Sequence, residues 1–596
     1  MLATAMILAI IVLLLLYLSC QKPKGYPPGK SRVLLKILFF LLFYITNIFL
    51  LSSGPRWWPI LGCALEIARI RQETGYLFKT CSTLCKKYGP VVGLKIGQDR
   101  IVILNDLESI RAMLTNKDCD GRPNGPFYKA RTWGVILGLL VVDDKLWIEQ
   151  RRFVIRHLRD FGFGRTSMLT IIEDEALKLV EHFKKILKNR YNYETADTRK
   201  MTTINNNNIG QIYKLQKDPK NKLNELNIRD EFHVLEDKIS NRKPHTVADL
   251  YMKAEAYAEV RKVSQSAGMI ISMHDAFGVT VLNTLWRMMA GRRYDAGDKE
   301  LTHLQRILTK LLNEIDMIGA PFSHFPLLRF IAPEMSGYKA FIETHQELWA
   351  FLKEELYNHK NTFLSNAPRD LMDVYLTVLN SKNCSDTFSE SQLLAICVDL
   401  FIAGSETTSK ALSFGFLNLI LNPQIQRKAH EEIDRVTGRN RFPTLADKSK
   451  MPYVEAIVLE SLRVFVGRTL SVPHRALKDT SIVGHKIPKD TMLVANFNRV
   501  LMDESWDDPE DFRPERFLDN NGNIITPEKY FPFGIGKHHC MGETLARSNI
   551  FIITATLLQA FSFSVVPGEP RPTMQDFVDG VTAGPKPYRA LVSLRM

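Results

Sequence analysis

The chain has 596 residues, of which 45% are hydrophobic and 24% are charged, and a formal net charge of +14. This composition allows a large buried core and excludes collagen-like and disulfide-scaffold proteins, and the eight scattered cysteines indicate a reducing compartment. The positive balance suits an anionic membrane or an acidic protein partner. Without zinc-finger spacing or a basic stripe interleaved with aromatic residues, we expect no nucleic acid partner.

The first 20 residues form an uncharged apolar run, which is long enough to span a bilayer. Four basic residues follow between positions 22 and 32, and positive charge on that side favours a cytosolic location for the rest of the chain. The alternative is a cleaved signal peptide, whose positive charges would precede the apolar run. We therefore expect a transmembrane anchor at residues 1–20.

Residues 21–54 combine a proline-rich hinge with a second apolar run. If that run spanned the membrane, the basic residues before it would lie in a short lumenal turn, against the positive-inside tendency. Removal of residues 30–54 would instead join Pro-Pro-Gly to Pro-Arg-Trp-Trp-Pro, an uninterrupted stiff connector. One hypothesis is that 30–54 is a retained intron or a gene-model error, and transcript reads that join Gly29 directly to Pro55 would support it.

Residues 55–596 have the pattern of one large catalytic domain that is mainly α-helical (α+β), with small sheets. An Asn- and Lys-rich stretch at about 189–265 buries little apolar surface, so we expect a disordered insertion there. Apolar periodicity predicts helices near 145–160, 167–188, 269–294, 300–318, 338–359 and 391–421. Strand patterns occur at 91–104, at 480–497 and near the C-terminus.

Two pairs of polar residues lie inside predicted helices. In Ala-Gly-Ser-Glu-Thr-Thr (403–408), a glycine and an acid–threonine pair interrupt an apolar helix and lower its propensity. The structural interpretation is a kink where threonine bonds back to a carbonyl. In Glu-Ser-Leu-Arg, Glu460 and Arg463 share a helix face, which alone indicates an ordinary surface pair.

Cys540 stands alone among glycines in Phe-Gly-Ile-Gly-Lys-His-His-Cys-Met-Gly, just before an apolar helix at 542–561. Glycines let a flat partner approach the backbone, and a helix N-terminus favours a thiolate. A thiolate without a second cysteine suggests a metal with one sulfur ligand, for which haem iron fits best. An inert buried thiol is the alternative.

These motifs together make the chain resemble the cytochrome P450 superfamily, from the Pro-Pro-Gly of the hinge to the C-terminus apart from the two interruptions. Phe533, Gly536, Cys540 and Gly542 match the haem-binding loop of that family. Three further segments, His157–Arg165, Ile271–Gly278 and Gly291–Tyr294, look most like the insect microsomal branch, which is related to vertebrate drug- and steroid-oxidising members.

The resemblance implies roles for individual residues. Cys540 would be the thiolate ligand of haem b (iron protoporphyrin IX), Thr407 would bond the iron-bound oxygen, and Glu406 would feed it protons. His538 stands where the family usually has arginine and would donate more weakly to a propionate. The other residues implied as propionate partners are Trp147, Arg151 and His474, and those implied in a structural ionic network are Glu460, Arg463 and Arg516.

The function implied is that of a haem-thiolate monooxygenase anchored in the endoplasmic reticulum, with its catalytic domain in the cytosol. It would insert one atom of O2 into a lipophilic small molecule, with pocket residues drawn in part from 464–472 and 576–584. Electrons would come from NADPH through NADPH–cytochrome P450 reductase, with cytochrome b5 as a further donor, because the chain has no flavin or nicotinamide motif. The alternatives are a haem-thiolate isomerase or dehydratase, which often lacks the acid–threonine pair, and an inactive haem-binding isoform.

Overall fold

The computed structural model describes residues 55, 57–160, 166–205, 268–295 and 297–595. The predicted anchor at 1–20 and the interrupted hinge at 21–54 lie outside the described residues. Within the described ranges, none of the helices combines the length and the apolar character that a membrane span requires.

The described chain is mostly helical, which confirms the predicted fold class, and the helices predicted near 145–160, 167–188, 300–318, 338–359 and 391–421 are all present. The α-helices are α3 (Ala64–Thr74), α4 (Leu77–Tyr88), α5 (Leu107–Thr115), α6 (Pro126–Ala130), α7 (Asp144–Asp160), α8 (Thr166–Asn205), α11 (Gly278–Ala290), α12 (Lys299–Glu314), α13 (Pro321–His324), α14 (Leu328–Ile331), α15 (Tyr338–Thr362), α16 (Leu371–Leu379), α17 (Glu390–Leu421), α18 (Pro423–Thr437), α19 (Pro452–Val466), α20 (Asn498–Leu501) and α21 (Glu543–Ala560). Short 3-10 helices are η1 (Lys117–Cys119), η3 (Leu445–Lys450), η4 (Glu504–Trp506) and η5 (Pro514–Phe517).

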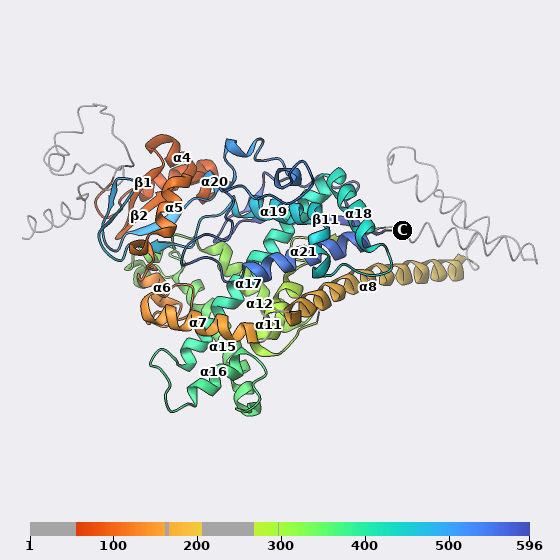
Figure 1. The fold of residues 1–596 in the computed structure, drawn as a ribbon, viewed down its shortest axis with the longest axis horizontal. Helices are drawn as coiled ribbons and strands as arrows, with labels where there is room; N and C mark the ends of the chain where they lie inside the picture. The colour runs from red at the N-terminus through yellow and green to blue at the C-terminus, as the bar shows by residue number, and fades with distance from the viewer. Residues whose placement is uncertain (1–54, 56, 161–165, 206–267, 296, 596) are drawn as a thin grey trace, which may run out of the picture.

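Helix α17 runs through the middle of the molecule and contacts α11, α15, α19 and α21 (Figure 1). It begins where the Ser389 hydroxyl accepts the backbone N–H of Gln392 at 3.0 Å, and it ends before Pro423, the first residue of α18. Its residues are apolar almost all round, as expected for a helix that is buried along most of its length. Helix α17 continues without a break through 403–408, and the kink expected there stays a prediction.

In the described residues the strands form four small sheets. The largest has the order β1-β2-β7-β4, in which β2 and β7 are parallel and the other neighbours are antiparallel. A second has the order β3-β11-β8, and β5-β6 and β9-β10 are hairpins. The bounds are β1 (Val91–Ile96), β2 (Asp99–Leu104), β3 (Met269–Ser272), β4 (His474–Arg475), β5 (Thr480–Ile482), β6 (His485–Ile487), β7 (Met492–Ala495), β8 (Phe561–Ser564), β9 (Phe577–Val578), β10 (Gly584–Pro585) and β11 (Arg589–Leu594).

Two segments differ from the sequence-based expectation. Residues 269–294 were expected to form one helix, but 269–272 are strand β3, and α11 begins only at Gly278. The strand forms because β11 supplies hydrogen-bond partners from the end of the chain. Helix α8 continues to Asn205, through the first part of the predicted insertion, and the remainder of that insertion lies outside the described residues.

Candidate active site

The loop 531–542 presents Cys540 immediately before α21. The backbone closes on itself, since the N–H of Cys540 donates to the carbonyl of Phe533 at 3.0 Å. Gly536 has a φ of +76°, and a Cβ at this position would overlap the carbonyl oxygen of Leu114 at the end of α5. Glycine is therefore required here both for the left-handed backbone and for the close approach of the two segments.

The Cys540 sulfur lies at the N-terminus of α21, whose N-cap is Gly542. Although the side chain is exposed, surrounding protein atoms desolvate the sulfur, and this burial raises the pKa of the thiol above its usual value. The backbone N–H of Gly542 and the charge of Arg151 lower the pKa but do not compensate. The helix terminus alone was expected to favour a thiolate, whereas here the free thiol keeps its proton. A metal bound to the sulfur would displace that proton.

Three aromatic rings meet beside the loop. The centroids of Trp147 and His538 are 4.5 Å apart, and those of His474 and His538 are 5.1 Å apart. Burial, followed by repulsion from Arg122, lowers the pKa of His538 to about 3 and that of His474 well below its usual value, so both rings are neutral. Their single N–H groups already donate to backbone carbonyls, from His538 Nε2 to Asp120 and from His474 Nδ1 to Cys119, each at 2.8 Å.

Two guanidinium groups supply the positive charge of the site. Arg151 donates to the carbonyl of His539 at 2.7 Å and lies over the Trp147 ring, 5.2 Å from its centroid. Arg122 is buried and donates to the carbonyl of Pro473 at 2.9 Å. Among the described residues, no carboxylate forms an ion pair with either group, and the Arg122 Nε has no partner. Burial lowers the pKa of Arg122 to about 10, which still leaves the group charged at neutral pH.

The donor set fits a haem. One buried and one half-buried guanidinium without a carboxylate partner are costly unless an anionic ligand compensates them, as the two propionates of a haem would. Arg122 was not among the residues predicted from the sequence. A buried arginine cannot be told from a surface arginine by sequence alone. Pro123, which follows Arg122, was the only local sign of a fixed backbone at this position.

The acid–threonine pair lies in the middle of α17. The Thr407 hydroxyl donates to the carbonyl of Ala403 at 2.7 Å, which is the bond from threonine back to a helix carbonyl that the sequence predicted. The hydroxyl oxygen can still accept a hydrogen bond. Ala403 is exposed although α17 is otherwise almost wholly buried, so this part of the helix faces open space. The Glu406 carboxylate is largely buried and pairs with Lys410 on the next turn.

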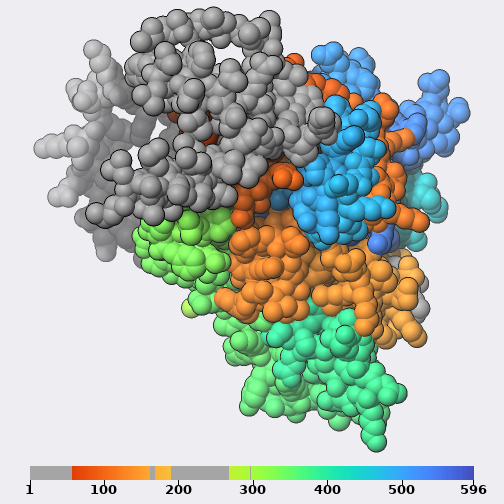
Figure 2. Space-filling view, turned by 90° about the vertical axis from the view of Figure 1, so that its left-hand side faces the viewer, coloured from red at the N-terminus to blue at the C-terminus, as the bar shows by residue number. Residues whose placement is uncertain are grey.

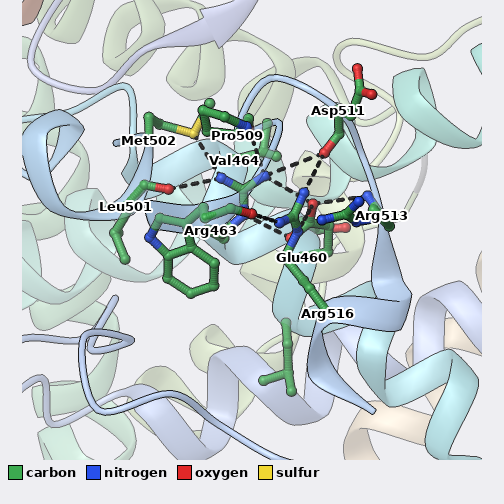
Figure 3. Close-up of polar contacts among 12 residues, drawn as sticks. Glu460, Arg463, Val464, Leu501, Met502, Pro509, Asp511, Arg513 and Arg516 are labelled. Atoms are coloured by element: carbon green, nitrogen blue, oxygen red, sulfur yellow. Dashed lines mark hydrogen bonds and ion pairs between the residues drawn. The ribbon is translucent and has the colours of Figure 1, made fainter. Parts of the chain in front are cut away.

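The predicted ionic network is assembled around Glu460 (Figure 3). Arg463 donates from Nε and Nη2 to the two carboxylate oxygens, and Arg516 donates from Nε to Oε1 at 3.1 Å. Further contacts hold the arginines, including those from Arg463 to the carbonyls of Leu501 and Pro509, at 2.8 Å each. The network thus joins α19 to η5 and to the chain that precedes it.

The described chain is thus a mainly helical domain with one cysteine in a glycine loop, two guanidiniums without a carboxylate partner beside it, and a polar pair on the central helix. The family model for cytochrome P450 matches residues 52–222 and 251–592, and the chain therefore belongs to that family.

The comparisons with curated proteins agree. The chain is 38% identical to "Probable cytochrome P450 303a1" of Drosophila melanogaster, over 98% of this chain and 97% of the relative. It is 30% identical to "Farnesoate epoxidase" of Bombyx mori, over 94% and 98%, and 29% identical to "Cytochrome P450 2U1" of Rattus norvegicus, over 97% and 92%. The protein is a P450 monooxygenase, and haem is the cofactor that its family implies.

Proposed function

We propose that this enzyme inserts one oxygen atom from O2 into a lipophilic small molecule: a hormone, terpenoid, steroid, fatty acid or xenobiotic. The other oxygen atom leaves as water, which takes up two electrons and two protons. The observation that carries this proposal is the intact Glu406–Thr407 pair on α17, beside the exposed Ala403. An acid and a hydroxyl at that position are the groups that ordered proton supply requires.

The chain's own residues would hold the cofactor from two sides. Cys540 would bind iron, and haem would supply the oxygen chemistry. The guanidiniums of Arg122 and Arg151 and the indole N–H of Trp147 are the donors suited to the propionates. The N–H groups of His474 and His538 already bind backbone carbonyls and are not free for the propionates. These two rings would therefore line the site without donating to the cofactor. Phe533, Gly536 and Gly542 would shape the loop that carries Cys540.

In this proposal, Thr407 and Glu406 act on protons. The Thr407 hydroxyl is held by the Ala403 carbonyl, so its oxygen has a fixed position from which to accept a hydrogen bond. The Glu406 carboxylate would take protons from solvent and pass them toward Thr407. A Thr407→Ala variant should consume NADPH with less product and more hydrogen peroxide, and unchanged yield would remove this role.

The electron donor in this proposal is NADPH–cytochrome P450 reductase, with cytochrome b5 as a second donor. Arg152, Arg156 and Arg159 are exposed on α7, the helix that carries Arg151 next to the Cys540 loop. Exposed arginines around the cofactor side suit an acidic electron-transfer protein, and the charge of +14 favours its approach. Charge-reversal at these positions should weaken reduction most strongly at low salt.

An apolar patch supports location at the endoplasmic reticulum membrane, with the catalytic domain on the cytosolic side. Its members are Ile60 (65% exposed), Leu65 (59%), Leu327 (71%), Phe330 (71%), Ile331 (77%) and Met335 (90%). These residues come from two segments, 60–65 and 327–335. The turn between β1 and β2 links them, because Gly97 donates to the carbonyl of Leu61 and Gln98 donates to the carbonyl of His324, just before the second segment. On the face drawn in Figure 2, green residues from the middle of the chain adjoin orange residues from its first third. Patches this apolar are typical of membrane or protein contacts.

The similarity to a farnesoate epoxidase favours an apolar terpenoid among the substrate classes. Substrate-induced changes in the haem spectrum across terpenoids, steroids and fatty acids would identify the class. A haem-thiolate isomerase or dehydratase would turn over without NADPH and reductase, so omission of both separates it from the proposal. An inactive isoform would bind haem without product under either condition.

A further inference from the structure

The ammonium group of Lys410 connects the acid of the proposed proton path to the C-terminal hairpin. Lys410 lies one turn after Glu406 on α17, and its Nζ is 3.1 Å from Glu406 Oε1. Nζ also donates to the carbonyl oxygen of Thr582 at 2.8 Å and to the Thr582 hydroxyl at 3.2 Å. An ammonium has three hydrogens, and these three acceptors match them. A long flexible side chain is thereby held in one place, and it is only 11% exposed.

Gly584 in β10 allows this contact. An ideal Cβ at Gly584 would lie 3.0 Å from Cε of Lys410 and 3.4 Å from its Cδ, tighter than ordinary side-chain contact. A larger residue at 584 would therefore press on the lysine stem and move its ammonium. Gly584 and the two Thr582 oxygens together form a binding site for the extended Lys410 side chain.

The segment between β9 and β10 is itself fixed to the rest of the molecule. The N–H of Val581 donates to the carbonyl of Leu312 in α12 at 2.8 Å. Asp579 pairs with Arg71 at 2.9 Å and accepts the N–H of Leu77 at 3.0 Å. These contacts with α3, α4 and α12, together with that of Lys410, hold the segment in place.

Lys410 binds one oxygen of Glu406, and in the part of the chain that the structure describes no other residue binds that carboxylate. We propose that Lys410 is a positioning residue for Glu406: it fixes Oε1 against the Thr582 segment and leaves Oε2 for proton exchange. This inference rests on the proposed role of Glu406 as a proton carrier. Without the ammonium, the Glu406 carboxylate samples other rotamers. Protons then reach Thr407 less often at the right position, and less product is formed per NADPH.

The test uses Lys410→Met, which keeps the stem and removes the charge, in the full haem-containing enzyme with reductase. We expect product formed per NADPH to fall by about 3- to 100-fold, the upper figure being the cost of a misplacement of about 1 Å. The missing electrons should appear as hydrogen peroxide, which takes two electrons and two protons per O2. Lys410→Arg should restore part of the yield, and Lys428→Met, which removes an exposed Lys–Glu pair, should change nothing.

Glu406→Gln separates this inference from the function on which it rests. If Glu406→Gln lowers the yield and Lys410→Met does not, the positioning role is wrong and the proton-carrier role stands. If Glu406→Gln has no effect, the proton-carrier role fails and the inference with it. If Lys410→Met does not retain haem, Thr582→Val takes its place. Valine has nearly the size of threonine but lacks the hydroxyl that accepts from Lys410, so product formed per NADPH should again fall.

A second measurement does not depend on turnover. Hydrogen–deuterium exchange of backbone amides at 580–584, in the haem-containing protein without substrate, should become faster in Lys410→Met and stay unchanged in Lys428→Met. Exchange at 580–584 that is equal in wild type and Lys410→Met would overturn the proposed connection between α17 and the hairpin.

Discussion

Arg463 donates two hydrogen bonds to Glu460, from Nε to Oε2 at 2.7 Å and from Nη2 to Oε1 at 2.9 Å, and neither side chain is exposed to solvent. The pair lies three residues apart on α19, and Arg516 adds a third charge. A buried pair of this kind adds little to stability in itself, but removal of one partner leaves an uncompensated charge.

Replacement of Glu460 by glutamine should therefore lower the free energy of unfolding by about 3–5 kcal/mol, because two buried guanidiniums lose their counter-charge. Urea-induced unfolding of the haem-containing protein measures this loss. Arg513→Met is the control, since its guanidinium is exposed and binds Asp507, and it should cost no more than about 1 kcal/mol. Equal losses in the two variants would show that burial of the network does not matter.

Two glycines of the Cys540 loop offer a matched comparison. Gly534 and Gly536 have φ values of +72° and +76°, but only at Gly536 would a Cβ overlap another backbone segment. Gly534→Ala should cost about 1–2 kcal/mol for the left-handed backbone. Gly536→Ala should cost more and lower the haem content of the purified protein, because the loop must move away from Leu114. Similar stability and haem content in both variants would contradict the packing argument.

His359 predicts a pH dependence of stability. Burial alone would lower its pKa, but hydrogen bonds to Asp370 and Glu355 prevail and raise the pKa to about 10. The Glu355 carboxylate also pairs with Arg292. The folded pKa exceeds the unfolded value of about 6.5, so the stabilisation is full below pH 6.5 and is lost as pH rises toward 10.

We therefore expect wild type to be more stable than His359→Gln at pH 6.5 and to lose that advantage steadily up to pH 10. Unfolding free energies of both proteins at matched pH values give the difference, in which titrating groups that do not contact His359 cancel. A difference that stays constant over this range would mean that His359 is not charged in the folded protein.

The apolar patch can be tested with the full chain in vesicles that contain a photoactivatable lipid. We expect labelled peptides from 60–65 and 327–335, and less label at the second segment in Phe330→Ser, because apolar side chains that are 59–90% exposed would enter the lipid surface. Peptides of an exposed polar surface, such as 519–523, provide the internal control. Labelling confined to the chain before residue 55 would contradict this orientation of the domain.

Local sequence patterns predicted the parts of the site that depend on one element. Trp147 and Arg151 are a turn apart on α7, and Glu460 and Arg463 share a face of α19, so helix periodicity alone places each pair. The Cys540 loop followed in the same way from its glycines and the helix after it.

The features that were not predicted depend on contacts between distant segments. Residues 269–272 became a strand because β11 pairs with them, and Lys410 binds Thr582, which is 172 residues later. Arg122 was missed for the same reason: its burial beside Pro473 is produced by the packing of two loops. The pKa of Cys540 also depended on surrounding atoms that a helix-terminus argument leaves out.

Ligation of haem iron by the Cys540 sulfur can be measured by replacing this residue with serine and recording the reduced carbon monoxide difference spectrum of the purified full chain. We predict that the band typical of a thiolate ligand disappears in Cys540→Ser, together with reductase-dependent product formation, while the helical content stays unchanged. A Cys540→Ser protein that keeps the wild-type band and still forms product would show that another group holds the iron.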